Sequence, residues 1–132
     1  VDLILSTFKN TLKNKIISWD EKPGITVVAA SKGYPENFEK YKEIKNLKNI
    51  EQNKFQQLFH AGTIKNKDGK ILSNGGRVLN STVIDSNLKE ARDKALNILD
   101  NLNWENKYYR RDIGYRVIKK WELFQVNLKV KN

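Results

Sequence analysis

The sequence predicts an α+β fold in which a small antiparallel β meander carries one packed helix. Two observations lead to this prediction: β-rich segments alternate with turn signals between about residues 55 and 85, and a strong amphipathic helix pattern follows at 88–102. The chain has 132 residues, of which 39% are hydrophobic. That composition is enough for one compact domain with a core.

The N-terminal segment, residues 1–14, is expected to be an amphipathic helix. It lacks a clear start signal, as though the chain entered it from an upstream segment. A short strand is expected at 16–19, and Pro and Gly mark a turn at 20–24. The apolar positions of the helix follow a 4-3-4 spacing: Val1, Leu5, Phe8 and Leu12.

The next segment, ITVVAA at residues 25–30, is apolar throughout and typical of a strand buried on both faces. A tight loop is expected at 32–35, and the Lys-rich stretch 36–50 is expected to be mostly surface loop with a possible short strand. The meander then follows. Its expected parts are a strand at 55–63, a hairpin turn at Asp68-Gly69, a strand at 70–73, a turn at 74–76 and a strand at 77–85.

The helix prediction is strongest at 88–102, where apolar residues share one face. Asn87 is the expected N-cap, with Glu90 at the capping-box position. Trp104 is expected to pack beneath the helix. Residues 115–130 are expected to return to strand, because apolar and polar residues alternate towards their end. The apolar residues of the helix face are Leu88, Ala91, Ala95, Ile98, Leu99 and Leu102.

Composition excludes several classes of site. The sequence contains no Cys and no Met, and its single His is His60, so disulfides, thiolate sites and His-rich zinc sites are excluded. No apolar run approaches the ~18 residues that a membrane helix needs, and no signal peptide is visible. We therefore expect a soluble cytoplasmic domain without a membrane partner. Because the chain starts at Val1, we also expect it to be a piece of a larger protein.

The formal net charge of +10 raises the alternative of a basic nucleic-acid-binding module. Lys outnumbers Arg by 20 to 5, however, and the positive charge is divided between both halves of the chain. This pattern favours a solvated Lys-rich surface over a nucleic-acid partner. A structural domain that braces a partner protein is a third alternative.

Asn74-Gly75-Gly76-Arg77 is the first candidate site. Two glycines before an Arg allow a close backbone approach, and exposed amides with a guanidinium would hold a phosphate or carboxylate. The alternative is a hairpin turn with a surface arginine, in which Arg77 pairs with a carboxylate such as Asp85 or Asp112.

His60 is a second candidate, either as a general base or as a half-buried strand residue whose ring is satisfied by backbone; the latter is favoured because no triad spacing singles it out. A third candidate is the run from Tyr108 to Arg116, which interleaves Tyr and Arg as a site that stacks bases would. For this run we favour a structural role, with Asp112 pairing with an Arg and the Tyr rings covering the edge of the core. No phosphate-loop motif and no carboxylate cluster with metal-ligand spacing accompanies these candidates.

Five segments occur in an order that resembles a known family. The chain is similar to the C-terminal domain of the phosphoribosylamine–glycine ligases, or glycinamide ribonucleotide synthetases. The resemblance spans about residues 25–118, and several separate motifs in order make it specific. They are SKGYP (31–35), FHAGT (59–63), DGKILSNGGRVLN (68–80), EARDKA (90–95) and YRRDIGYR (109–116).

The resemblance implies an enzyme of the ATP-grasp superfamily that joins glycine to 5-phosphoribosylamine in purine biosynthesis, with ATP and Mg²⁺ or Mn²⁺. It implies that residues 1–20 are the tail of the preceding ATP-grasp domain and that 21–118 form a barrel-sandwich-like C-terminal domain. That domain would pack against the upstream ATP-grasp and N-terminal domains and help to wall the active site. Residues 119–132 extend beyond the family, and an edge strand is the expectation for them.

The nucleotide and metal ligands of the family lie upstream of this chain, so we assign no catalytic or metal-binding residue here. The fragment alone is expected to bind neither ATP nor metal and to be inactive. The residues expected to line the substrate side are Arg77, Asn74, Gly75, Gly76, His60, Lys32, Gly33 and Tyr34.

Overall fold

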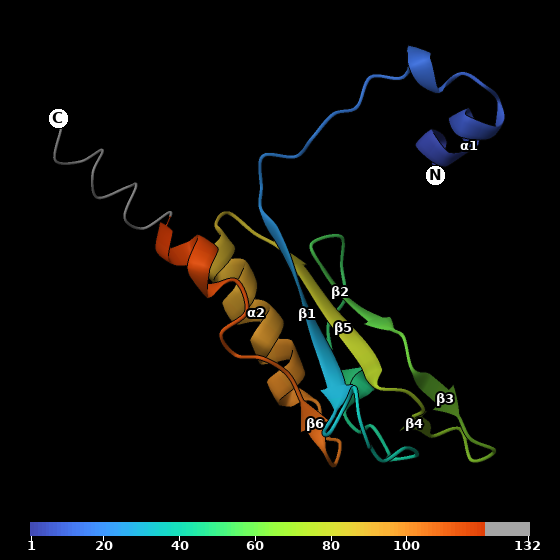
Figure 1. The fold of residues 1–132 in the computed structure, drawn as a ribbon, viewed down its shortest axis with the longest axis vertical. Helices are drawn as coiled ribbons and strands as arrows, with labels where there is room; N and C mark the ends of the chain where they lie inside the picture. The colour runs from blue at the N-terminus through green and yellow to red at the C-terminus, as the bar shows by residue number, and fades with distance from the viewer. Residues whose placement is uncertain (121–132) are drawn as a thin grey trace, which may run out of the picture.

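The structure, a computed structural model, describes residues 1–120. Its centre is a four-stranded antiparallel sheet in the order β2-β5-β1-β6, with α2 packed against β1 and β5 (Figure 1). A separate two-stranded sheet pairs β3 with β4. The α+β prediction is therefore confirmed. The main elements are β1 (Gly24–Ser31), β2 (Gln56–His60), β3 (Thr63–Lys65), β4 (Ile71–Ser73), β5 (Arg77–Ile84), α2 (Leu88–Asn101) and β6 (Lys107–Tyr108).

The strands between residues 55 and 85 are connected differently from a simple meander. The predicted strand 55–63 is interrupted at 61–62, and β2 pairs with β5 while β3 pairs with β4. These segments are thus one long antiparallel hairpin that bends in the middle. Its tip is the predicted Asp68-Gly69 turn, where Gly69 has φ +81°. The stretch 74–76 is therefore a bend within the hairpin and not a second hairpin turn.

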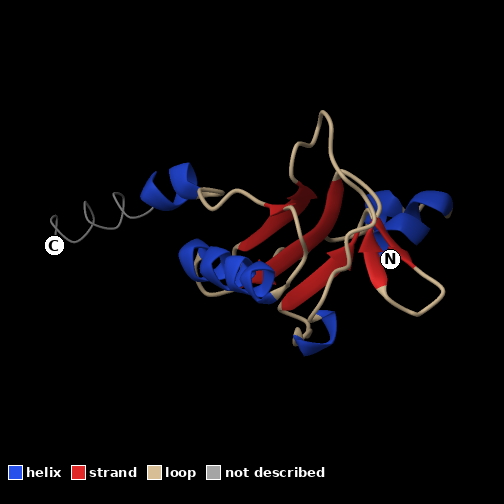
Figure 2. Ribbon diagram, turned by 90° about the horizontal axis from the view of Figure 1, so that it is seen from below, coloured by secondary structure: helices blue, strands red, loops and turns tan. Residues whose placement is uncertain are grey.

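The core lies between the sheet and α2. Val27 and Ala29 of β1 face the helix, which contributes Ala91, Ala95 and Leu99 at 0% exposure. The prediction that β1 is buried on both faces is wrong, because its alternate residues Thr26 and Val28 are exposed. No element of residues 1–120 covers that face of the strand (Figure 2). The predicted packing of Trp104 is confirmed, since this side chain is only 4% exposed and belongs to the core.

The start of α2 follows the sequence prediction. The side chain of Asn87 accepts a hydrogen bond from the backbone N–H of Glu90 at 2.9 Å, as an N-cap does. The Glu90 carboxylate accepts a hydrogen bond from the Ser86 hydroxyl at 3.1 Å. The predicted capping position is therefore confirmed, with Ser86 as the partner of Glu90.

Replacing this cap gives a first test of the fold. Asn87→Ala is expected to lower the free energy of unfolding by about 1 kcal/mol, because one N–H of the first turn loses its acceptor. Asn97→Ala, in the exposed middle of the same helix, is the matched control and should be neutral or slightly stabilising. Urea denaturation of both variants measures the difference. Equal stabilities would contradict the capping role.

The two ends of the chain depart from the predictions. The N-terminal helix is shorter than expected, with α1 at Asp2–Phe8 and a 3-10 turn, η1, at Leu12–Asn14. No strand forms at 16–19, because this segment pairs with no other strand among the described residues and runs away from the body (Figure 1).

Residues 115–120 are helical, so the predicted strand is wrong there. The backbone N–H groups of Val117 and Ile118 both donate to the carbonyl of Gly114, which starts a helical turn where a strand would need a partner. The alternating residues at 124–130, and most of the predicted extension 119–132, lie outside the described residues. The stretch 36–50 is mostly irregular, as predicted, with a 3-10 turn, η2, at Leu47–Asn49.

Candidate functional site

Three segments that are distant in the sequence meet where β1 ends and β5 begins, at the lower end of the view in Figure 1. They are the loop after β1, the bend between β2 and β3, and the bend between β4 and β5. We call this the glycine corner and define it by Ser31, Tyr34, Gly62, Gly75 and Gly76. The corner unites segments from three of the motifs that carry the family resemblance.

Missing Cβ atoms allow the segments of the glycine corner to touch. A Cβ on Gly62 would lie 2.6 Å from the Arg77 carbonyl oxygen and 2.8 Å from the Gly75 Cα. A Cβ on Gly76 would lie 1.8 Å from Cδ2 of Tyr34. Such distances are impossible between real atoms, so both positions require glycine for close packing.

Ser31, which is not among the residues predicted to line the substrate side, completes the corner. Its backbone N–H donates to the Gly76 carbonyl at 2.8 Å, and its hydroxyl donates to the Gly75 carbonyl at 3.1 Å. Ser31 is 1% exposed, and Gly76 is buried beneath Tyr34. The expectation that this turn exposes its backbone amides is therefore wrong for Gly76. The sequence signal for Ser31 is a small hydroxyl residue that ends an otherwise apolar strand.

Arg77 lies beside the corner and is exposed. Neither carboxylate suggested as its partner is available, because Asp85 pairs with Lys94 at 2.5 Å and Asp112 pairs with Arg110 at 2.6 Å. Within residues 1–120, no carboxylate forms an ion pair with Arg77. Its guanidinium is thus able to meet an anion from outside these residues.

The other predicted residues surround the same corner. The backbone N–H of Asn74 donates to the Gly62 carbonyl at 2.7 Å, and that of Lys32 donates to the Asn106 carbonyl at 2.7 Å. Gly33 has φ +95°, the left-handed region that favours glycine, which lets the loop carry Tyr34 back onto the corner.

His60 ends β2, directly before the bend at 61–62. Its ring is exposed, and Nδ1 lies 3.0 Å from the Thr63 hydroxyl, so the expectation of a half-buried ring satisfied by backbone is wrong. No acidic or nucleophilic partner other than Thr63 is bonded to this ring in the part of the chain that the structure describes.

The pairing of Asp112 with an Arg is confirmed, but the expectation that the Tyr rings cover the edge of the core holds only for Tyr109, because Tyr108 and Tyr115 are 54% and 52% exposed. Arg110 pairs with Asp112, whereas Arg111 and the Tyr109 hydroxyl both donate to Asp100 of α2. Burial, together with the Asp100 carboxylate, raises the pKa of Tyr109 to about 12. Burial lowers the pKa of Lys107, whose ammonium donates to the Leu99 and Leu102 carbonyls at the end of α2.

The hydrogen bond from Tyr109 to Asp100 predicts that the stability of the fold depends on pH. Because the folded state raises the pKa of Tyr109 from 10.0 to about 12, the neutral phenol contributes stability below pH 10 that is lost as the pH rises towards 12. The stability difference between the native chain and Tyr109→Phe should therefore shrink between pH 9 and pH 12 in urea titrations. Tyr115→Phe, at a half-exposed ring, is the control. A difference independent of pH would contradict this role of Tyr109.

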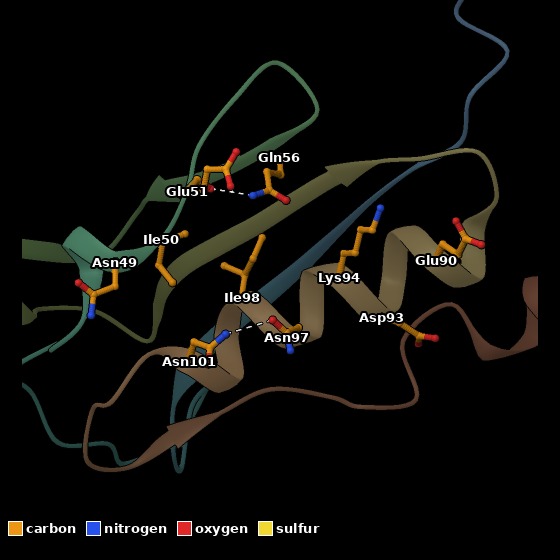
Figure 3. A pocket seen from close by; sticks show the side chains of 10 residues that line it. All are labelled: Asn49, Ile50, Glu51, Gln56, Glu90, Asp93, Lys94, Asn97, Ile98 and Asn101. Atoms are coloured by element: carbon orange, nitrogen blue, oxygen red, sulfur yellow. Dashed lines mark hydrogen bonds between the residues drawn. The ribbon is translucent and has the colours of Figure 1, made fainter.

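A surface groove lies elsewhere, between α2 and residues 49–56, with a volume of about 570 Å³ (Figure 3). It contains none of the eight predicted site residues. Its walls carry three Asn side chains and three acidic groups, namely Glu51, Glu90 and Asp93, together with Lys94. Nothing in its lining connects it with the glycine corner.

Among residues 1–120, no three His, Asp or Glu side chains converge as metal ligands. Over the same residues, no helix has the length and apolar character required to cross a membrane.

Comparison with known proteins agrees with the order of the motifs. The family model described as "Phosphoribosylglycinamide synthetase, C domain" matches residues 24–116. The phosphoribosylamine–glycine ligase of Agrobacterium fabrum is 40% identical over 116 residues, which are 88% of this chain and 27% of that protein. The ligase of Haemophilus influenzae is 36% identical over 121 residues, or 91% of this chain and 28% of that protein.

A solved structure agrees with the family match. The crystal structure of phosphoribosylamine–glycine ligase from Thermotoga maritima matches with a TM-score of 0.63 and 32% identity, covering 83% of this chain and 27% of that one. The chain therefore spans about a quarter of the length of the relatives it matches. From the family match over 24–116 and the shared fold, the chain belongs to the phosphoribosylglycinamide synthetase C-domain family.

Proposed function

We propose that this chain is the C-terminal portion of an ATP-dependent ligase that joins glycine to 5-phosphoribosylamine in de novo purine biosynthesis. The observation that supports the proposal is the family match over residues 24–116, in relatives that are named phosphoribosylamine–glycine ligase. The enzyme would work in the cytoplasm.

In the proposed ligase, ATP and Mg²⁺ or Mn²⁺ are held by upstream domains. Activation of the glycine carboxylate as an acyl phosphate requires groups that neutralise the phosphate charge. The donor set of residues 1–120 does not fit this task, because no cluster of metal-ligating side chains occurs there. The chain would instead complete the active site from one side, with glycine and phosphoribosylamine as the substrates.

Residues 1–20 would be the tail of the upstream ATP-grasp domain. The match to the Haemophilus influenzae ligase covers 91% of this chain, which is more than residues 24–132 make up, so it includes part of this segment. Phe8 and Trp19 are 82% and 84% exposed, as expected of side chains whose partner belongs to another domain. Residues 21–118 would form the C-terminal domain proper.

The substrate side would be the glycine corner with Arg77. The Arg77 guanidinium, which no carboxylate of residues 1–120 pairs with, is suited to a phosphate or carboxylate group, because it offers two parallel N–H donors. The 5-phosphate of phosphoribosylamine is the proposed ligand group. Lys32 and His60, both exposed at the same end of the sheet, would lie on the same wall.

The proposal is tested by comparing the 132-residue chain with a protein extended upstream by the ATP-grasp and N-terminal domains. The chain alone should release no phosphate from ATP in the presence of glycine and phosphoribosylamine, whereas the extended protein should show glycine-dependent turnover. The control omits glycine. Glycine-dependent turnover by the chain alone, or its absence from a folded extended protein, would refute the proposal.

A further inference from the structure

The direction of Arg77 is set by an irregularity in β5. Leu79, Ser81 and Val83 are buried on the face that α2 covers, because alternate residues of a strand share one face. Continued alternation would place Arg77 on that same covered face. Instead the pairing with β1 shifts by one residue at Val78, and Arg77 is exposed while Val78 and Leu79 are both buried. Such a bulge re-aims the next side chain.

The residue before Arg77 is held from two sides. The Tyr34 ring lies directly against Gly76, where a Cβ would be 1.8 Å from Cδ2 of the ring. Phe38 supports the ring edge-on, with centroids 5.8 Å apart and planes at 69°. On the backbone, the Gly76 carbonyl accepts the N–H of Ser31 at 2.8 Å. Gly76 is therefore fixed by one aromatic contact and one hydrogen bond.

The backbone of Arg77 is held as well. Its carbonyl accepts the N–H of Gly62 at 3.0 Å, and it stands opposite Ala30 in the register with β1. Among residues 1–120, no hydrogen bond involves the Tyr34 hydroxyl. The contribution of Tyr34 is thus the shape of its ring and not its polarity.

We propose that Tyr34, seated on Gly76, is a positioning residue: it stabilises the bulge that turns Arg77 away from the helix-covered face and holds the guanidinium ready for an anionic group of the substrate. This inference rests on the proposed function for the identity of the ligand, and it changes the role of Tyr34 from substrate contact to support. An arginine whose backbone is held in place before binding loses less conformational entropy when the ligand arrives.

Two variants disturb the contact in opposite ways. Tyr34→Ala removes the ring, and Gly76→Ala adds a methyl group that the ring must avoid. In the ligase that carries this chain, both should raise KM for phosphoribosylamine about tenfold, with KM for ATP unchanged. Tyr34→Phe should behave as the native protein. Gly24→Ala is the matched glycine control, because its Cβ would make only an ordinary contact of 3.4 Å with Ile84 at the far end of the same sheet.

A second measurement separates this inference from the proposed function. In the 132-residue chain, ¹⁵N relaxation of the Arg77 Nε–H should report greater mobility in Tyr34→Ala and Gly76→Ala than in Tyr34→Phe and Gly24→Ala. Unchanged mobility and an unchanged KM in the first two variants would overturn the positioning role. If mobility rises in the first two variants, while KM for phosphoribosylamine is unchanged in them and in Arg77→Lys, the positioning role is supported and the substrate role of Arg77 is overturned. A loss of activity that is explained entirely by a lower melting temperature, and that occurs in Tyr34→Phe as well, would also overturn the inference.

Discussion

Gly62→Ala should lower the free energy of unfolding by about 3 kcal/mol, because the added methyl group has no room among its neighbours. The new Cβ would lie 2.6 Å from the Arg77 carbonyl oxygen and 2.8 Å from the Gly75 Cα. Both neighbours are backbone atoms, so no side chain is able to rotate aside. Relief requires the two strands of the bent hairpin to separate, which would break the hydrogen bond from Gly62 to Arg77.

Urea denaturation of the 132-residue chain measures this effect, with Gly24→Ala as the control. Gly24 is also in the four-stranded sheet, but its Cβ would meet Ile84 at an ordinary 3.4 Å, so the change should stay within about 0.5 kcal/mol. If Gly62→Ala proved as stable as Gly24→Ala, the close approach of the two bends would be wrong.

Local patterns were sufficient to predict much of this fold. The position of α2, its Asn87 cap and the Asp68-Gly69 turn all depend on residues within one turn of one another, and all three are confirmed. Packing of Trp104 followed from its place directly after an amphipathic helix. In each case the interacting residues are close together in the sequence, so the sequence pattern indicates the interaction.

The glycine corner depends on contacts that no local pattern contains. Gly75-Gly76 has the composition of a turn, but its actual partners are Gly62 and Tyr34, which come from segments far along the chain. Similarly, the bulge at Val78 arises where β5 meets β1. The predicted strand at 16–19 failed for a related reason, because a strand forms only where another strand is present to pair with it.

The Asn74–Arg77 turn and His60 were singled out by their chemistry, and the order of five motifs then connected them with the loop at 32–34. The structure then shows which charged groups pair with one another around these residues. Asp85 and Asp112, the suggested partners of Arg77, are both engaged by other cations, Lys94 and Arg110. That arrangement leaves Arg77, beside the glycine corner, suited to bind an anion from outside residues 1–120.

Arg77→Lys should therefore have the largest effect on substrate binding in the ligase that carries this chain. Lysine keeps the positive charge but loses the forked pair of donors. A hydrogen bond to a charged group contributes about 1.5–3 kcal/mol, so KM for phosphoribosylamine should rise about 10- to 100-fold while KM for ATP stays unchanged. Because the lost contact is remote from the reacting amine, kcat should change little.

Arg92→Lys, on α2 beside Asp93, is the control for an arginine that only forms an ion pair, and its kinetics should be native. Native kinetics for Arg77→Lys, or a loss explained entirely by a lower melting temperature, would assign Arg77 a structural role.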